Sequence, residues 1–382
     1  MPSSGPPTAV AGVWQRLWEQ DPIGETETAD TTTLVLWTQT PKSGIYVDIR
    51  LPKDSPGRSL EGAEAAGYLR RPQAIEGTGI TATVDNEDET NVVARFARQK
   101  SFAGVLNFSR GDTTTSGAAL EKDNELAKLA AVTTPTSSSI PLCTCFWRRD
   151  IDYQPPTGGL DIGVCASGPA NADGSIDMRE TGSDGSYAEL WHRLPGSNDG
   201  PFMALQLLTE DDLPRVGYWV RTGKYFAYAV GRPSNEETAT QLGCHPKSSA
   251  VQSSSCTGKS LLEAINALDD STDWKNQLKL LGSYVAVCGE LEPSETSQMH
   301  WNIKQSTDPR LVGCRLIDAK MEDGVSCSVF TFLDSKGNTK SNKELVQVDD
   351  ILCQRLAGES GKVRKWQVME ISGASHLPGL VA

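Results

Sequence analysis

Histidine, long apolar runs and positive charge are all scarce in this sequence. Its 382 residues include 4 His, and these lie too far apart for the ligand spacing of a metal site. No apolar stretch approaches the roughly 18 residues that a membrane-spanning helix requires. Lys and Arg total 36 against 49 Asp and Glu, a net charge of -13, which repels phosphate backbones and anionic lipid head groups. We therefore expect no metal, no other cofactor, no nucleic-acid partner and no membrane association.

The sequence also lacks the pattern of a secretory signal and that of a disulfide framework. Residues 1–8 contain neither the basic segment nor the apolar segment that a signal peptide has. The 9 cysteines are odd in number and scattered, whereas a small secreted scaffold shows dense, paired spacing. Cys143 and Cys145 fall on one strand face without a CxxC pair, which favours two core thiols over a metal site. These features predict a cytoplasmic protein with reduced thiols.

Short strands dominate the remaining pattern. Apolar and polar residues alternate over runs that are bounded by Gly, Ser, Asn, Asp and Pro, which is the pattern of antiparallel strands. Only residues 89–99 and 261–281 have helical periodicity, and the Ser/Thr-rich and polar segments within 113–139 are expected to be insertions between strands. The fold class is therefore all-β with minor helices. The clearest predicted strands are 33–38, 45–51, 102–108, 143–147, 160–165, 187–193, 202–208, 216–220, 225–230, 284–288, 326–332 and 366–371.

Five landmarks recur in the same order in the two halves of the chain, and the first three are offset by roughly 180 residues. They predict two tandem β domains, residues 1–175 and 176–382. Each domain is expected to be an antiparallel barrel, because closure removes the exposed edges of a sheet. The paired landmarks are the strands at Trp14 and Trp191, the proline-closed strands 45–52 and 226–233, the segments beginning at Ser101 and Ser283, the lone Trp147 and Trp301, and the Gly-Cys pairs at Cys165 and Cys314.

Gly12-Val13-Trp14 matches the Gly-x-Trp signature that opens lipocalin-type barrels. In those barrels the tryptophan closes one end and commonly stacks on an arginine from a late strand, for which Arg148 or Arg149 is the expected residue. More broadly, the chain resembles the tandem lipocalin-like family known from a fungal casein-kinase-interacting protein and from uncharacterised bacterial and algal relatives. The resemblance implies two lipocalin-like barrels and assigns no catalytic residue. It is carried by Val35–Thr40, Tyr46–Pro52, Phe102–Gly104, Trp147–Pro155, Tyr187–Trp191 and Trp366–Glu370.

The strand 45–51 has two chemically different faces. Ile45, Val47, Ile49 and Leu51 share one face, and Tyr46, Asp48 and Arg50 share the other. In one interpretation the apolar residues fill the barrel and the polar ones face water. In the other, the apolar face packs on a neighbouring domain and the polar triplet lines the barrel interior, where it forms a site for a polar or anionic ligand.

Three further residues are candidates for acid/base chemistry. Asp150 and Asp152 lie about 7 Å apart if they share a strand face, a spacing compatible with paired carboxylates. The alternative is an exposed ladder of charges with Arg148. His192 lies in a predicted strand and could act as an acid or base, but a surface histidine is the more common case.

These observations favour a non-catalytic protein that binds a small apolar or amphipathic molecule inside a barrel. Two alternatives stay open: a protein–protein interaction module, and a small-molecule acid/base enzyme that uses Tyr46, Asp48 and Arg50. The candidate catalytic residues are Asp48, Arg50, Asp150, Asp152 and His192. The candidate ligand-binding residues are Trp37, Gln39, Tyr46, Asp48, Arg50, Trp147, Arg149 and Trp219.

Overall fold

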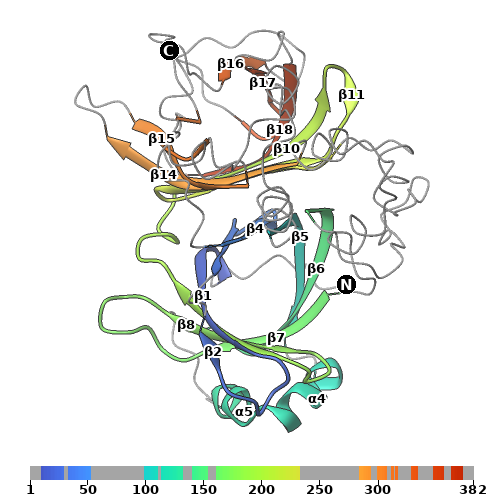
Figure 1. The fold of residues 1–382 in the computed structure, drawn as a ribbon, viewed down its shortest axis with the longest axis vertical. Helices are drawn as coiled ribbons and strands as arrows, with labels where there is room; N and C mark the ends of the chain where they lie inside the picture. The colour runs from blue at the N-terminus through green and yellow to red at the C-terminus, as the bar shows by residue number, and fades with distance from the viewer. Residues whose placement is uncertain are drawn as a thin grey trace, which may run out of the picture.

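The computed structural model of the chain is built from two antiparallel β-sheets, one above the other in Figure 1. Two short helices lie at the far end of the first sheet. The structure describes residues 10–29, 33–52, 99–110, 113–131, 140–153, 161–232, 284–293, 299–307, 311–313, 315–316, 328–333, 347–356 and 363–372.

The first sheet closes into a barrel. Its strands follow the order β2-β1-β3-β4-β5-β6-β7-β8-β9, and β9 pairs back onto β1, so that every strand except β2 belongs to a closed ring. The all-β fold that the sequence predicts is confirmed by this arrangement. The strands are β1 (Gly12–Gln20), β2 (Thr28–Ala29), β3 (Thr33–Gln39), β4 (Ile45–Pro52), β5 (Lys100–Arg110), β6 (Cys143–Asp152), β7 (Asp161–Ser167), β8 (Asp177–Gly182) and β9 (Ala188–Arg193).

The barrel extends past the domain boundary expected at residue 175. Strands β8 and β9 lie beyond that residue, and Trp191 pairs with Arg16 of β1 instead of opening a second domain. The chain passes to the second sheet between Arg193 and Phe202. A landmark comparison cannot find this point, because Trp14 and Trp191 both occupy strands of the same barrel.

The second sheet has the order β15-β14-β13-β12-β10-β18-β17-β16, with β11 paired to β10. This order follows that of the first sheet when β10 is set against β1, β12–β15 against β3–β6, and β16–β18 against β7–β9. Within the described residues no ladder joins β15 to β16, so the closed ring is described for the first sheet. The strands are β10 (Phe202–Glu210), β11 (Leu213–Pro214), β12 (Gly217–Thr222), β13 (Tyr225–Val230), β14 (Val285–Pro293), β15 (Met299–Ser306), β16 (Ser328–Leu333), β17 (Ile351–Leu356) and β18 (Val363–Ser372).

Two helices occupy part of the segment that was expected to be an insertion between strands. They are α4 (Thr113–Lys122) and α5 (Asn124–Ala130). Ala119 and Leu126 are fully buried against Val164 and Ala166 on the outer face of β7, and this apolar contact supports the short helices. The helices expected at 89–99 and 261–281 fall outside the described residues, apart from Gln99.

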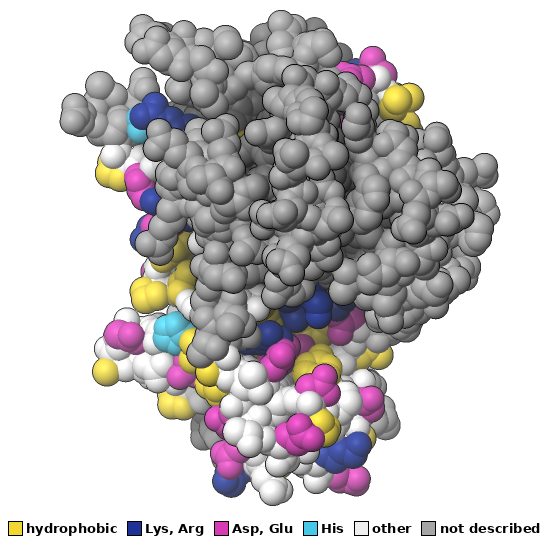
Figure 2. Space-filling view, in the orientation of Figure 1, with side chains coloured by type: hydrophobic (Ala, Val, Ile, Leu, Met, Phe, Trp, Pro, Cys, Tyr) yellow, Lys and Arg dark blue, Asp and Glu magenta, His cyan; other side chains and the backbone are white. Residues whose placement is uncertain are grey.

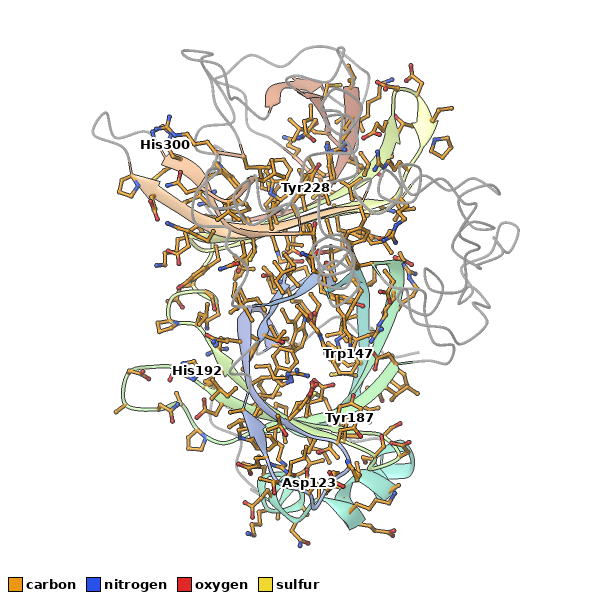
Figure 3. All side chains as sticks on the ribbon, viewed as in Figure 1. Asp123, Trp147, Tyr187, His192, Tyr228 and His300 are labelled. Carbon is orange, nitrogen blue, oxygen red and sulfur yellow. The ribbon has the colours of Figure 1, made fainter. Side chains whose placement is uncertain are left out.

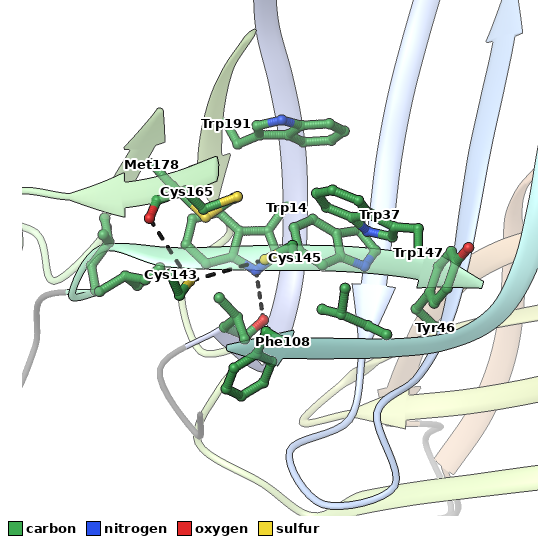
Figure 4. Packing of buried hydrophobic residues seen from close by; sticks show 14 of the residues in the cluster. Trp14, Trp37, Tyr46, Phe108, Cys143, Cys145, Trp147, Cys165, Met178 and Trp191 are labelled. Carbon is green, nitrogen blue, oxygen red and sulfur yellow. Dashed lines mark hydrogen bonds between the residues drawn. The ribbon is translucent and has the colours of Figure 1, made fainter. Parts of the chain in front are cut away.

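Three apolar clusters hold the molecule together. One fills the first barrel, and Figure 4 shows its tryptophans and cysteines packed between the strands. A second covers one face of the other sheet around Trp219, Trp301 and Trp366. The third lies between the two sheets and contains the outward face of β4 together with Tyr218, Val220, Ala227 and Ala229.

Candidate functional site

The polar face of β4 points into the barrel, and its apolar face points out of it. Ile45, Val47, Ile49 and Leu51 are buried in the cluster between the sheets, whereas Tyr46 belongs to the cluster inside the barrel. Asp48 is only 3% exposed. The second interpretation of this strand therefore fits the structure, because the neighbouring sheet covers its apolar face.

One end of the barrel is closed by an aromatic ring and a cation. Trp14 is fully buried and donates its indole N–H to the Val10 carbonyl over 2.9 Å. The Arg193 guanidinium lies 5.5 Å from the Trp14 ring. The prediction that Arg148 or Arg149 stacks on this tryptophan was wrong. The stacking residue is Arg193, which lies on β9, the last strand of the barrel, and pairs directly with Trp14 across the ladder.

Next to this end lies a tryptophan layer, which we define as Trp37, Trp147 and Trp191. The Trp37 ring is 6.0 Å from that of Trp147 and 5.8 Å from that of Trp191, and both contacts are edge-to-face. Among the described residues, the indole N–H groups of Trp37 and Trp191 find no hydrogen-bond partner, and neither does the amide of the fully buried Gln39. Buried donors without an acceptor are costly, at about 1–3 kcal/mol each.

A charged layer follows on the other side of the tryptophans. In register, Trp37 stands opposite Asp48, and Trp191 stands opposite Arg16, so the two layers are in direct contact. Figure 3 shows nitrogen and oxygen atoms gathered inside the barrel between the labelled Trp147 and Tyr187. We define the charged layer as Arg16, Asp48, Arg50, Arg149, Asp152, Asp161, Glu180 and Glu189.

Most charges in this layer are paired. The Arg50 guanidinium donates to both oxygens of Asp48, at 2.9 and 3.3 Å, and Arg16 pairs with Glu189. Burial alone would lower the pKa of Arg50, but Asp48 and Glu189 raise it well above its usual value. Asp48 is therefore fixed in a closed ion pair, which argues against a role as a free general base.

Arg149 on β6 forms ion pairs with Asp161 and, at 3.4 Å, with Asp152. Its guanidinium also stacks 3.9 Å from the Phe102 ring. Figure 2 shows basic and acidic side chains side by side below the middle of the view.

Glu180, which the sequence patterns did not indicate, is the exception to this pairing. It lies on β8 and is 5% exposed. The Tyr187 hydroxyl donates to its Oε1 atom over 3.1 Å, while the ion pairs of the layer involve other carboxylates. Burial first, and then the nearby Glu189 and Asp161 carboxylates, raise the pKa of Glu180 well above its usual value. The segment Asp177–Gly182 contains Met178 as its one large apolar residue, so it offers little alternation and was not predicted as a strand.

A β-bulge separates Asp150 from Asp152, so the shared strand face expected for them does not form. The register shifts between Ala103 and Gly104. A side chain at Gly104 would place its Cβ 1.9 Å from the Arg148 carbonyl oxygen, so the bulge requires glycine there. Asp152 then pairs with Arg149 in the charged layer, whereas Asp150 accepts a hydrogen bond from Tyr218 of the second sheet over 2.5 Å.

The two remaining candidates lie elsewhere. His192 is partly exposed, and its Nδ1 atom lies 2.7 Å from Asp177 Oδ1. Trp219 belongs to the apolar cluster of the second sheet, 5.3 Å from Trp301. The structure thus brings together Trp37, Gln39, Tyr46, Asp48, Arg50, Trp147 and Arg149, and leaves Trp219 and His192 apart.

Neither a metal-binding cluster nor a membrane-spanning helix is found in the described ranges. No group of three or more His, Cys, Asp and Glu side chains in those ranges is placed to hold a metal ion. None of the helices described there has the length and apolar character needed to cross a membrane.

The chain is similar to a known protein family and to a protein of known structure. The model of a family described as Protein HRI1 matches residues 17–279. A crystal structure of the uncharacterized protein YLR301w from Saccharomyces cerevisiae is similar to 95% of this chain and to 99% of its own, with a TM-score of 0.39 and 10% identity. None of the curated proteins compared matches the sequence.

Proposed function

The chain belongs to the Protein HRI1 family, and we propose that it binds a small amphipathic molecule inside the first barrel without catalysing a reaction. The observation that carries this proposal is the contact between the tryptophan layer and the charged layer within one interior. Apolar and aromatic walls bind the apolar part of a ligand, and a few convergent polar groups orient the rest.

The unpartnered donors support the same proposal. Trp37 and Trp191, whose indole N–H groups are unpartnered among the described residues, pair across the ladders with Asp48 and Arg16 of the charged layer. Each needs an acceptor, since a buried donor left without one destabilises the folded protein. A ligand oxygen supplies such an acceptor in the bound protein. In the free protein a water that the ligand later displaces would supply it.

The lipocalin-like assignment of both halves is part of this proposal. Its support is the Gly12–Trp14 opening, the Arg193 stack, and the common order of strands in the two sheets. The buried, unoxidised thiols of Cys143, Cys145 and Cys165 support a cytoplasmic location.

Native mass spectrometry of the full chain, purified from its own host, tests the proposal. We expect a bound mass that denaturation releases. Trp37→Phe removes one unpartnered donor and part of the aromatic wall, so it should lose the bound mass. Trp219→Phe makes the same change in the second sheet and should keep it. A wild-type protein with a clean mass and a melting temperature that no host extract raises would contradict the proposal.

A further inference from the structure

Glu180 stands out in the barrel because it is a buried carboxyl group beside an aromatic ring, with its neighbouring cations already engaged. From this geometry we infer that Glu180 binds the positively charged end of the ligand, an organic ammonium group, next to the Trp147 ring. The inference rests on the proposed function, since it names the chemical class of the molecule bound in the same interior.

The carboxyl of Glu180 is held by a hydroxyl and by no ammonium or guanidinium group of the described residues. Tyr187, directly before β9, donates to Oε1. The three guanidinium groups of the layer are paired with Asp48, Glu189, Asp152 and Asp161. A buried carboxylate is stable when a cation and hydrogen bonds compensate for its lost hydration. A bound ammonium group supplies that cation.

Gly163 brings the carboxyl and the indole ring close together. A Cβ added at this glycine would lie 2.9 Å from Glu180 Oε1 and 2.9 Å from Trp147 Cζ3. Both groups therefore lie against the same backbone position of β7, which has no side chain. A carboxylate beside an aromatic ring is the combination that recognises organic cations, because the ring face adds to the attraction of the anion.

Charged groups act on Glu180 from several strands. Glu189 on β9 and Asp161 on β7 are acidic, and Arg50 on β4 is basic. The other members of the charged layer, among them Asp48 on β4, Arg16 on β1 and Arg149 on β6, are held in their own ion pairs. The acidic neighbours favour the protonated form of Glu180, as its raised pKa shows. Binding of an ammonium group should favour the ionised form and release a proton. An anionic ligand would not favour the ionised form of Glu180, so its binding should release no proton.

The unpartnered donors of the neighbouring layer are a separate sign that a ligand belongs here. Trp37 and Trp191 are each 2% exposed, and their rings are 5.8 Å apart. Trp191 shares an inward face with Glu189, the strand neighbour of Glu180. A molecule with an ammonium group at Glu180 and an acceptor oxygen nearer the tryptophans would satisfy both sets of groups.

Three aromatic probes of similar size test the inference by isothermal titration calorimetry on the full chain. They are phenethylamine, phenethyl alcohol and 3-phenylpropionate, which share a ring and differ in charge. We expect the wild type to bind the amine at least about tenfold more tightly than the alcohol, and the acid most weakly. Glu180→Gln should reduce amine affinity to that of the alcohol. Glu125→Gln, which removes an exposed carboxylate of α5, should change nothing.

The proton balance gives a second readout. Titrations of the amine in buffers of different ionisation enthalpy should show proton release in the wild type and none in Glu180→Gln. Amine affinity should also rise with pH until Glu180 is ionised in the free protein.

Equal binding of amine and alcohol, or an amine affinity that Glu180→Gln leaves intact, would overturn the inference while the proposed function survives. If none of the three probes binds and native mass spectrometry shows no bound mass, both the inference and the proposed function are contradicted.

Discussion

At the scale of single residues, Glu180 couples the stability of the barrel to pH. Its carboxyl is buried beside Glu189 and Asp161, so its pKa in the folded protein lies well above the value of an unfolded chain. Between these two values the folded state holds a proton that the unfolded state has lost. The stability that this proton confers is fully present below the unfolded pKa, near 4.3, and disappears as pH rises through the folded pKa.

Glu180→Gln should remove this dependence, because a glutamine keeps the shape of the protonated acid and never ionises. We expect the variant to melt a few degrees above the wild type at pH 8 and close to it at pH 4.5, which corresponds to roughly 1 kcal/mol or more at the higher pH. Thermal unfolding followed by circular dichroism across this range measures the difference. The same shift at both pH values would mean that ionisation of Glu180 plays no part.

At the scale of elements, the attachment of α5 depends on one buried aspartate. Asp123 caps the helix by accepting from the backbone N–H groups of Glu125 and Leu126, both at 3.1 Å. Its other oxygen accepts from Arg179 and Thr181 of β8, both at 2.6 Å. Burial alone would raise the pKa of Asp123, but the hydrogen bonds from Arg179 and Thr181 lower it below the usual value. One side chain thus starts the helix and fixes it to the barrel wall.

Asp123→Ala should cost about 3 kcal/mol or more in urea unfolding, because it removes a cap and leaves the buried Arg179 without its carboxylate. Asp123→Asn keeps the cap through its amide oxygen and loses the charged oxygen that accepts from Arg179 and Thr181, so its cost should be smaller. Since the folded pKa is lowered, the charge stabilises the protein above the unfolded pKa near 3.9. The difference between wild type and Asp123→Asn should therefore shrink as pH falls below about 4. A cost that is constant with pH would contradict this account.

At the scale of the whole molecule, the second sheet sets the environment of the barrel interior. It covers the apolar face of β4, and Tyr284 of that sheet donates to Ser101 over 2.9 Å, which in turn donates to the Asp48 carbonyl over 2.8 Å. The turn before β4 is held as well, because the backbone N–H groups of Lys42 and Ser43 donate to Glu370. The strand that carries Asp48 and Arg50 is therefore positioned from outside the barrel.

Val47→Asp should disrupt this contact, since it places a carboxylate in the apolar cluster between the sheets, where Val47 is fully buried. We expect a loss of at least about 3 kcal/mol and a larger radius of gyration in solution scattering. Ala229→Asp, on the facing β13, should do the same. Leu17→Asp introduces the same charge at a position that is 38% exposed and should leave both measurements near wild type. Compact, fully stable Val47→Asp protein would show that the sheets do not depend on this cluster.

Much of the strand content could be predicted from the sequence, because alternation of apolar and polar residues is a local signal. The run at 45–51 became β4 with almost the same bounds. The bulge opposite Gly104 could not be predicted, since one inserted residue reverses the two faces without changing the composition of β6. Glu180 could not be predicted for a related reason. Asp177–Gly182 carries little apolar alternation, and only its pairing with β7 and β9 makes it a strand.

The sequence by itself determined that this chain forms antiparallel strands and that tryptophans on these strands pack in the apolar core. It could do so because side-chain alternation and turn residues act over a few neighbouring positions. It also determined that Tyr46, Asp48 and Arg50 share one face. Only the tertiary structure decided that this face points inward and meets Glu180. That choice depends on which surface the second sheet covers, and the burial of one apolar face against a distant segment of the chain is not encoded in the strand itself.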